Sequence, residues 1–265
     1  MLLQSKKAQV GIIMKLEKVL AVAMEIGEGM LISGAEVSRV EDTIDRICRA
    51  YGAKETDVFS ITSSIVTSLK TEEDEILTQT KRIHGYTTDF KRLDEFNTLS
   101  RYICKNFPEE TYIRQEIDRI NAQKVYNLRQ KALISAMIAG AFAAFFHGGV
   151  EEGITAVLTG AMVTILAAFL RLFSSNTMFI NFVSAFFVAS CAYLSAKAGF
   201  AIDYGKVIIG NIMLLVPGVA FVNSLRDMIG GDMMSGILRL CESVLLTIFL
   251  AGGSFASLVF WGGIF

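Results

Sequence analysis

Five long apolar segments in the second half of the sequence restrict what this chain can fold into. A helix needs about 20 consecutive, mostly apolar residues to cross a bilayer. Segments close to that length occur at residues 132–149, 153–170, 177–196, 205–222 and 236–261. Only 12 of the 51 charged residues lie within 131–265, whereas a soluble domain of that length has about 34. We therefore predict an α-helical polytopic membrane domain of five spans over residues 131–265.

The first half of the chain, residues 1–130, has the pattern of a small α/β (α+β) domain. Apolar residues recur every three or four positions in four stretches, which predicts amphipathic helices over residues 12–30, 37–51, 90–103 and 108–120, the last beginning at Pro108. Ser33 and Glu36 match the capping box that begins a helix. Residues 59–69 are rich in β-branched and hydroxyl side chains, and residues 76–83 alternate, which together predict a β-hairpin.

The domain formed by residues 1–130 is expected to lie in the cytoplasm. The opening stretch has no apolar run long enough for a signal peptide before charges resume at Lys15. Lys124, Arg129 and Lys131 then stand on the inner side of the first span, as the positive-inside rule requires. An odd number of spans places the chain end at Phe265 on the outer side.

Composition and motifs exclude several classes of function. A formal net charge of −1 argues against nucleic-acid binding through bulk charge. A zinc site needs closely spaced ligands, and the cysteines and histidines of this chain are too far apart in the sequence to provide them. These residues are Cys48, Cys104, Cys191, Cys241, His84 and His147. Since the sequence also lacks a phosphate-binding loop, a dinucleotide fingerprint and a nucleophile elbow, we expect no cofactor and no enzyme activity.

Two further patterns leave alternatives open. A run of hydroxyl side chains could line a small polar pocket or form one polar face of a sheet; it comprises Ser60, Thr62, Ser63, Ser64, Thr67 and Ser68. Small residues four apart let helix backbones approach closely, either within the membrane bundle or against another subunit. These rows are Ala136, Gly140 and Ala144 in the first span, and Ala156, Gly160, Thr164 and Ala168 in the second.

The stretch from Asn211 to Glu242 carries the residues most informative about function. Pro217 has no N–H, so the carbonyl of Met213 loses its helical partner, and Gly218 loosens the helix further. Asn211 lies seven residues before Gly218, on the same face of a continuous helix. Bare carbonyls at membrane depth are tolerated only against protein or a water-filled cavity. We therefore predict a polar substrate groove at a helix break.

A cluster of charged residues follows near the inner membrane face, namely Arg226, Asp227, Asp232, Arg239 and Glu242. Arg239 and Glu242 are three residues apart at the start of the fifth span and can pair. Charges in spans are costly and often mark a transport pathway; the alternative is interfacial snorkelling with a structural salt-bridge network. An intramembrane aspartyl protease is disfavoured, because Ile229 replaces the glycine that its motif needs before Asp232.

Two motifs together resemble the bacterial threonine/serine exporter family. The first runs over residues 34–44 and includes Gly34, Glu36, Arg39 and Glu41. The second lies in the membrane half and includes Pro217, Gly218, Asn223, Arg226, Asp227 and Asp232. The resemblance extends over about residues 15–255. It matches the N-terminal half of longer members, which have about ten spans in two halves.

This resemblance implies a subunit of a secondary exporter of small polar carboxylate metabolites across the bacterial inner membrane. Threonine and serine, or a dicarboxylate such as succinate, are the implied substrates. Split members of the family imply a second, smaller membrane subunit and a homo- or hetero-oligomer. No nucleotide-binding motif is present, so we do not expect ATP to drive transport, and the resemblance implies coupling to the membrane potential or protons. The candidate substrate-path residues are Asn211, Pro217, Gly218, Asn223, Arg226, Asp227, Asp232, Arg239 and Glu242.

The alternative function is a membrane-anchored sensor whose cytosolic domain binds a ligand and acts through a partner protein. The hydroxyl run around residues 60–68 would then form the ligand pocket. The helix-breaking Pro217-Gly218 pair inside a span favours the exporter.

Overall fold

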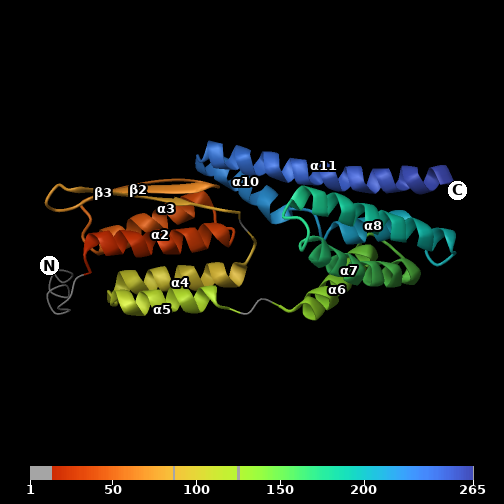
Figure 1. Ribbon diagram of the computed structural model, residues 1–265, viewed down its shortest axis with the longest axis horizontal. Coiled ribbons are helices and arrows are strands. Elements are labelled where there is room, and N and C mark those ends of the chain that lie inside the picture. Colours follow the sequence, from red (N-terminus) through yellow and green to blue (C-terminus); the bar gives the residue numbers. More distant parts are fainter. Residues whose placement is uncertain (1–13, 86, 124–125, 265) are drawn as a thin grey trace. The chain divides into compact units, whose positions relative to one another are not determined.

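A computed structural model describes residues 14–85, 87–123 and 126–264 (Figure 1). Ile12, Lys124 and Phe265, on which parts of the predictions above depend, lie outside these residues. The described residues of Met1–Lys124 and Val219–Leu240 form one compact unit, called unit 1. Those of Val125–Gly218 and Cys241–Phe265 form unit 2. The functional division at residue 130 stays a prediction.

Unit 1 contains four helices of the N-terminal region, a small sheet, and a later helical segment. Its N-terminal helices are α2 (Leu16–Ile32), α3 (Val37–Ala50), α4 (Phe90–Asn106) and α5 (Glu110–Asn121). Helices α2 and α3 lie between the sheet and the pair α4 and α5 (Figure 1). The later segment comprises most of α10 (Gly218–Gly230) and the start of α11 (Met233–Ile264).

The sheet of unit 1 is antiparallel, in the order β1 (Glu55–Ile61), β2 (Ser64–Lys70) and β3 (Ile76–Arg82). The predicted β2–β3 hairpin is confirmed. Residues 59–69 are not one strand, however, because a two-residue turn after Ile61 folds β1 back onto β2 with Ile61 opposite Ser64. Alternation divides the hydroxyl run between the two faces: Ser60 and Thr67 are buried, while the Ser68 and Thr78 hydroxyls bond to each other on the outer face.

The apolar core of unit 1 follows the predicted helical periodicity. Val19, Ile26, Ile44, Ile103 and their neighbours on these faces are buried. The same periodicity would place Phe90 on the inner face of α4, but its side chain is 61% exposed at the first residue of that helix. Burial also raises the pKa of the Cys48 thiol to about 12, as expected for a packing cysteine.

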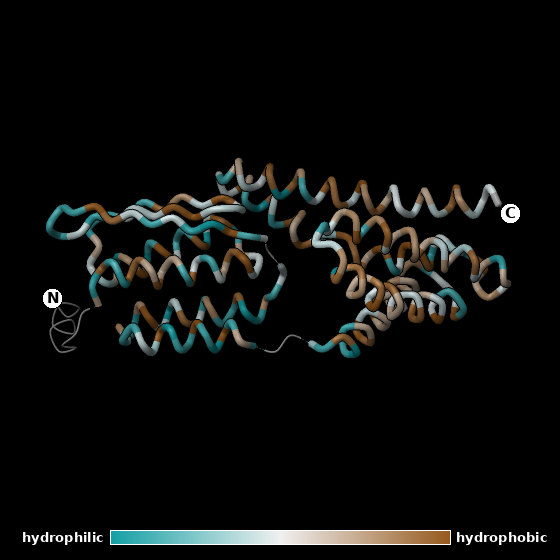
Figure 2. The backbone as a smooth tube through the Cα atoms, in the orientation of Figure 1, coloured by the Kyte–Doolittle hydropathy of each residue, from teal (hydrophilic) through white to brown (hydrophobic). Residues whose placement is uncertain are grey.

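Unit 2 is helical, with α6 (Leu128–Phe145), α7 (Val150–Leu170), α8 (Thr177–Lys197), α9 (Tyr204–Ile212) and the remainder of α11. Among the described residues, four helices are long and apolar enough to cross a membrane: α6, α7, α8 and α11. Their apolar character is visible in Figure 2, in contrast to the mixed colours of α2 to α5. The predicted span at 205–222 is not one helix, so five spans are not confirmed.

Short polar residues begin several of these helices by accepting hydrogen bonds from first-turn N–H groups, which otherwise lack partners. These N-caps are Asp89 for α4, Asn127 for α6, Asn176 for α8 and Asp203 for α9. Asn127 and Gln130 form a complete capping box. By contrast, the predicted Ser33–Glu36 box is wrong. Ser33 lies at the end of α2, and its hydroxyl donates to the Gly29 carbonyl at 2.6 Å.

The small residues of α6 and α7 pack against other helices of unit 2. A Cβ on Gly160 would lie 2.7 Å from Ala139 Cβ and 3.0 Å from the Ser135 carbonyl. A Cβ on Gly210 of α9 would lie 2.8 Å from the Ala139 carbonyl. Helices α6, α7 and α9 thus approach to backbone contact at these glycines, which is the intramolecular use of the small-residue rows.

Candidate functional site

The loop between α2 and α3 forms one side of the candidate site. Gly34 has a φ of +94°, a conformation that glycine adopts without strain, and a Cβ there would lie 3.2 Å from the Thr87 carbonyl. Helix α3 therefore begins at Val37, with Glu36 as its N-cap residue. The Glu36 side chain does not cap its own helix, so the first N–H groups of α3 need partners from elsewhere.

Helix α10 supplies those partners from almost 190 residues later in the sequence. Asp227 Oδ1 accepts a hydrogen bond from the Val37 N–H at 3.2 Å. One turn earlier, Asn223 Nδ2 donates to the Gly34 carbonyl at 3.0 Å. Arg226 forms an ion pair with Glu36 at the exposed edge of this contact. The carboxylate of Asp227 thus caps α3, where the helix dipole favours negative charge.

Arg239, in the second turn of α11, completes the arrangement. Its Nη1 lies 3.1 Å from Asp227 Oδ2, and its Nη2 donates to the Ala35 carbonyl at 2.9 Å. The side chains of Arg239 and Asp227 are 3% and 0% exposed. Gly231, with a φ of +102°, makes the turn that brings α10 and α11 back together. We call Asp227, Arg239 and the backbone of Gly34–Val37 the motif junction.

The remaining acidic residues of the two motifs lie beside this junction. Asp232 is half-buried, and it lines a hollow of about 470 Å³ with Glu41 and Ser38. Glu41 accepts a hydrogen bond from the Ser60 N–H at 2.7 Å. Burial raises the pKa of the Glu41 carboxyl, and the nearby charge of Asp232 adds to that rise. No group of residues in the described ranges has the arrangement of a metal site.

Asn211 lies in unit 2, at the end of α9, and is fully buried. Its Nδ2 donates to the Val207 carbonyl at 3.0 Å, while its Oδ1 accepts no hydrogen bond from the described residues. A Cβ on Gly160 would come within 3.2 Å of that oxygen, so the amide faces α7 closely. A buried amide oxygen without a donor is rare in folded proteins and requires an explanation.

The predicted helix break at Pro217 is confirmed. Helix α9 ends at Ile212 and α10 begins at Gly218, with a series of tight turns between them. The spacing argument that placed Asn211 and Gly218 on one helical face is therefore wrong, because no continuous helix joins them. Nothing lies within 4 Å of a Cβ built on Gly218.

The structure thus brings most residues of the two sequence motifs together, and it places other candidate residues away from them. Gly34, Glu36, Asn223, Arg226, Asp227 and Arg239 form or border the motif junction, with Glu41 and Asp232 beside it. Arg39 is exposed on α3. Glu242 is exposed and belongs to unit 2. Within unit 1, the carboxylate paired with Arg239 is that of Asp227. The pairing of Arg239 with Glu242 stays a prediction. The sequence analysis missed the backbone partners at Ala35 and Val37.

Both motifs fall within a known protein family. Residues 21–261 match the profile of the ThrE family, described as "Putative threonine/serine exporter". This chain belongs to the threonine/serine exporter family. The match includes the junction residues, the first three candidate spans of this family member, and all but the last two residues of the fourth.

Individual relatives of this threonine/serine exporter family member have low sequence identity to it, but they match most of its length. A "Threonine/serine exporter" of Corynebacterium glutamicum is 27% identical over 236 residues, which are 86% of this chain and 48% of that protein. A "Probable threonine/serine exporter" of Mycobacterium tuberculosis is 25% identical, over 91% of this chain and 46% of its own length. The chain therefore spans about half the length of these relatives.

A shorter relative matches over nearly its whole length. The "Probable succinate transporter subunit YjjP" of Escherichia coli is 22% identical over 248 residues, which are 90% of this chain and 93% of that protein. No solved structure matches this exporter-family chain.

Proposed function

We propose that the chain is a subunit of a secondary exporter that moves small polar carboxylate metabolites across the bacterial inner membrane. Membership of the exporter family over residues 21–261 and the four candidate spans support this reading. The names of the relatives suggest two substrate classes, hydroxy amino acids and a dicarboxylate. Both classes carry a carboxylate, so an arginine in the substrate path is expected to meet it.

The motif junction is the observation that carries the proposal. Arg239 stands at the start of a candidate span, yet its side chain is bound to Asp227 and to the Ala35 carbonyl of the soluble helices. A substrate carboxylate that replaced Asp227 on the guanidinium would release Asp227 from the N-terminus of α3. The chain would then either bind substrate at Arg239 or keep the contact of Asp227 with the N-terminus of α3. A transporter that alternates between two states needs contacts that differ between them in this way.

The interrupted segment from α9 to α10 would provide the remaining crossing and part of the substrate path. Broken helices at membrane depth bind substrates through backbone groups that a continuous helix keeps occupied. Asn211 supports this role, because its buried Oδ1 lacks a donor in the described structure. A hydroxyl or ammonium group of a substrate would satisfy that oxygen. Five crossings would put residues 1–130 and the end of α11 on opposite sides of the membrane, and the positive-inside rule favours the cytoplasm for residues 1–130.

A second membrane subunit would complete the exporter. The chain matches about half of its two longer relatives, and the shorter relative is named a subunit. The second subunit would supply the portion of the longer relatives that this chain does not match.

Efflux measurements with a neutral version of the junction test the proposal. The double variant Asp227→Asn/Arg239→Gln removes both buried charges together, which costs far less stability than removing one. We expect near-normal membrane abundance with most efflux of labelled threonine or succinate lost, per unit of inserted protein and with the second subunit co-expressed. The exposed ion pair of Lys54 and Asp74 lies outside both motifs and provides the matched control, so Lys54→Gln/Asp74→Asn should retain efflux. Normal specific efflux in the Asp227/Arg239 double variant would refute the assignment of the site.

A further inference from the structure

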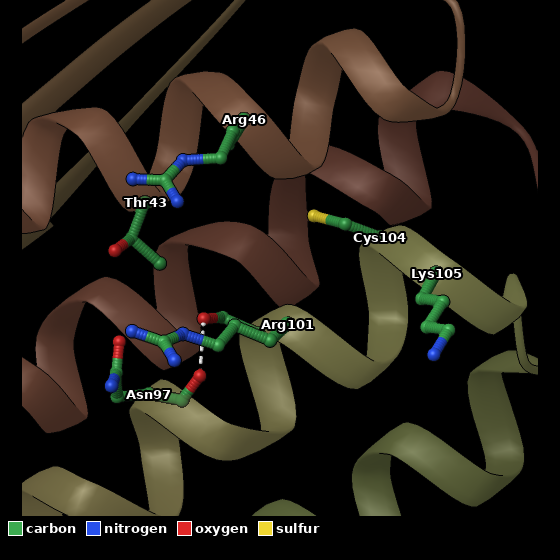
Figure 3. Close-up of a pocket in the computed structure, with 7 residues that line it drawn as sticks. Thr43, Arg46, Asn97, Arg101, Cys104 and Lys105 are labelled. Atoms are coloured by element: carbon green, nitrogen blue, oxygen red, sulfur yellow. Dashed lines mark hydrogen bonds between the residues drawn. The ribbon is translucent and has the colours of Figure 1, made fainter.

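A hollow of about 220 Å³ lies between α3 and α4 of unit 1, away from the motif junction. Thr43 and Arg46 line it from α3, and Asn97, Ser100, Arg101 and Lys105 line it from α4. Asn97 and Arg101 are one helical turn apart and therefore share a face of α4. Figure 3 shows the Arg101 guanidinium lying back along α4 toward Asn97, below Arg46 and Thr43.

The charge of this hollow is one-sided. Three cationic side chains line it, and no carboxylate does. Arg46 pairs with Asp42 on its own helix, but both side chains are more than half exposed, so the pair is weak. Within the described ranges of the chain, the side chains of Arg101 and Lys105 form no hydrogen bond or ion pair. The guanidiniums of Arg46 and Arg101 therefore keep donors for an external anion, with Lys105 at the rim.

The hydroxyl groups of the hollow offer hydrogen-bond acceptors, but their own protons are already donated to backbone carbonyls. Thr43 Oγ1 donates to the Arg39 carbonyl and Ser100 Oγ donates to the Asn97 carbonyl, each at 2.8 Å. An anion would consequently be held mainly by the cationic groups, whose planar guanidiniums match carboxylate oxygens, with the amide of Asn97 as a further donor in the lining. The α-ammonium of an amino acid would find no negative partner in this lining. The charge balance thus favours a dianion over a zwitterion.

The size of the hollow limits the ligand. At roughly 30 Å³ per water molecule, a volume of 220 Å³ corresponds to about seven waters. A short dicarboxylate displaces a similar volume, whereas a nucleotide is far larger. We propose that unit 1 binds a small dianionic carboxylate between Arg46 and Arg101, at a site distinct from the motif junction and independent of the proposed transport path.

Occupancy of this site would act on the junction through α3. A dicarboxylate would bridge α3 and α4 at Thr43 and Arg46, about two turns along α3 from the N-terminus that Asp227 caps. Binding to the folded state alone stabilises it, by an amount that grows with the ratio of ligand concentration to its dissociation constant. The site would therefore let the concentration of a cytosolic dicarboxylate set the stability of the element that the junction holds.

Calorimetric titration of the purified full chain in detergent tests the site. Succinate should bind with a dissociation constant that weakens at least tenfold in Arg101→Gln and more modestly in Lys105→Gln. Arg82→Gln, an exposed arginine of β3 outside the hollow, is the matched control and should bind as the unchanged chain does. Affinity should also fall as salt is raised, because the cations are solvent-exposed.

Parallel titrations with inorganic phosphate and threonine decide the ligand class. Succinate binding at least tenfold tighter than either would support a dicarboxylate site. Equal or tighter binding of phosphate or threonine would overturn it. Undiminished succinate binding in Arg101→Gln, or succinate binding lost in Asp227→Asn/Arg239→Gln but retained in Arg101→Gln, would also overturn it by placing the ligand elsewhere.

Discussion

At the scale of single residues, the buried pair of Asp227 and Arg239 decides how unit 1 responds to mutation. Removal of either partner takes away the ion pair and leaves the other charge buried without it, at a cost of about 3–5 kcal/mol. We expect Asp227→Asn and Arg239→Gln each to lower the thermal midpoint of the purified chain strongly. The double variant should lie much closer to the unchanged protein. Strictly additive effects of the two substitutions would show that the side chains do not act as a pair.

Glu41 should make the stability of unit 1 depend on pH. Its pKa is raised in the folded state by burial, so the folded chain holds this proton to higher pH than the unfolded chain does. Its contribution therefore favours folding at low pH and is lost as pH rises from the usual glutamate range through the raised pKa.

Glu41→Gln should accordingly raise the thermal midpoint at pH 8 and change it little at pH 4. Glu73→Gln, on the exposed turn between β2 and β3, is the control for the loss of one acidic residue. A gain for Glu41→Gln that is the same at both pH values would contradict the argument.

Sequence reasoning identified most residues of the motif junction but not their partners. Asp227 and Arg239 stood out because charged residues close to spans are costly. Helical spacing suggested Glu242 as the partner of Arg239, since side chains three apart on one helix are neighbours. The actual partner in unit 1 depends on the turn at Gly231. The contacts with Ala35 and Val37 join backbone groups about 190 to 200 residues away, which no local pattern reveals.

At the scale of elements, the hairpin of α10 and α11 depends on a glycine at residue 236. A Cβ there would lie 2.7 Å from the Ser224 carbonyl and 2.9 Å from the Met228 nitrogen, both in α10. Gly236→Ala should force the two helices apart and destabilise unit 1 by about 1–3 kcal/mol, the usual range for overpacking.

Gly230→Ala provides the matched control for this substitution. Gly230 ends α10, and nothing lies within 4 Å of a Cβ built on it. Thermal unfolding of both purified variants should show a lower midpoint for Gly236→Ala alone. Equal midpoints for the two would mean that α10 does not pack closely against α11.

The elements themselves were predicted where their periodicity is long, and missed where it is short or interrupted. Helices α2 to α8 and α11 follow from apolar spacing and long apolar runs. Strand β1 was missed in part because Glu55 and Asp57 have little strand propensity. The segment at 205–222 has the hydropathy of a span, but hydropathy ignores the missing N–H of Pro217 that separates α9 from α10.

At the scale of the whole molecule, the first expectation is that this chain does not export alone. Expressed by itself in a host without an exporter, it should leave efflux of labelled threonine and succinate at background. Co-expression with a second membrane subunit that corresponds to the other half of the longer relatives should restore efflux. Full efflux by the purified chain in liposomes would refute this expectation.

The second expectation concerns orientation in the membrane. With five crossings, residues near 130 face the cytoplasm and the end of α11 faces outward. A reporter fused at residue 130 should be active only as a cytoplasmic fluorophore, and one after residue 265 only as an external phosphatase. Phosphatase activity at residue 130 would overturn the arrangement, and cytoplasmic fluorescence after residue 265 would show an even number of crossings.

The capping of α3 by Asp227 also has a consequence for biosynthesis. The ribosome produces Val37 long before it produces Asp227, and α6 to α9 are synthesised in between. The N–H of Val37 therefore has no Asp227 carboxylate to bond until three candidate spans have been synthesised. Unit 1 is the first part of the chain to be made and among the last to be finished. A nascent chain that ends before α10 therefore lacks the side chain that caps α3.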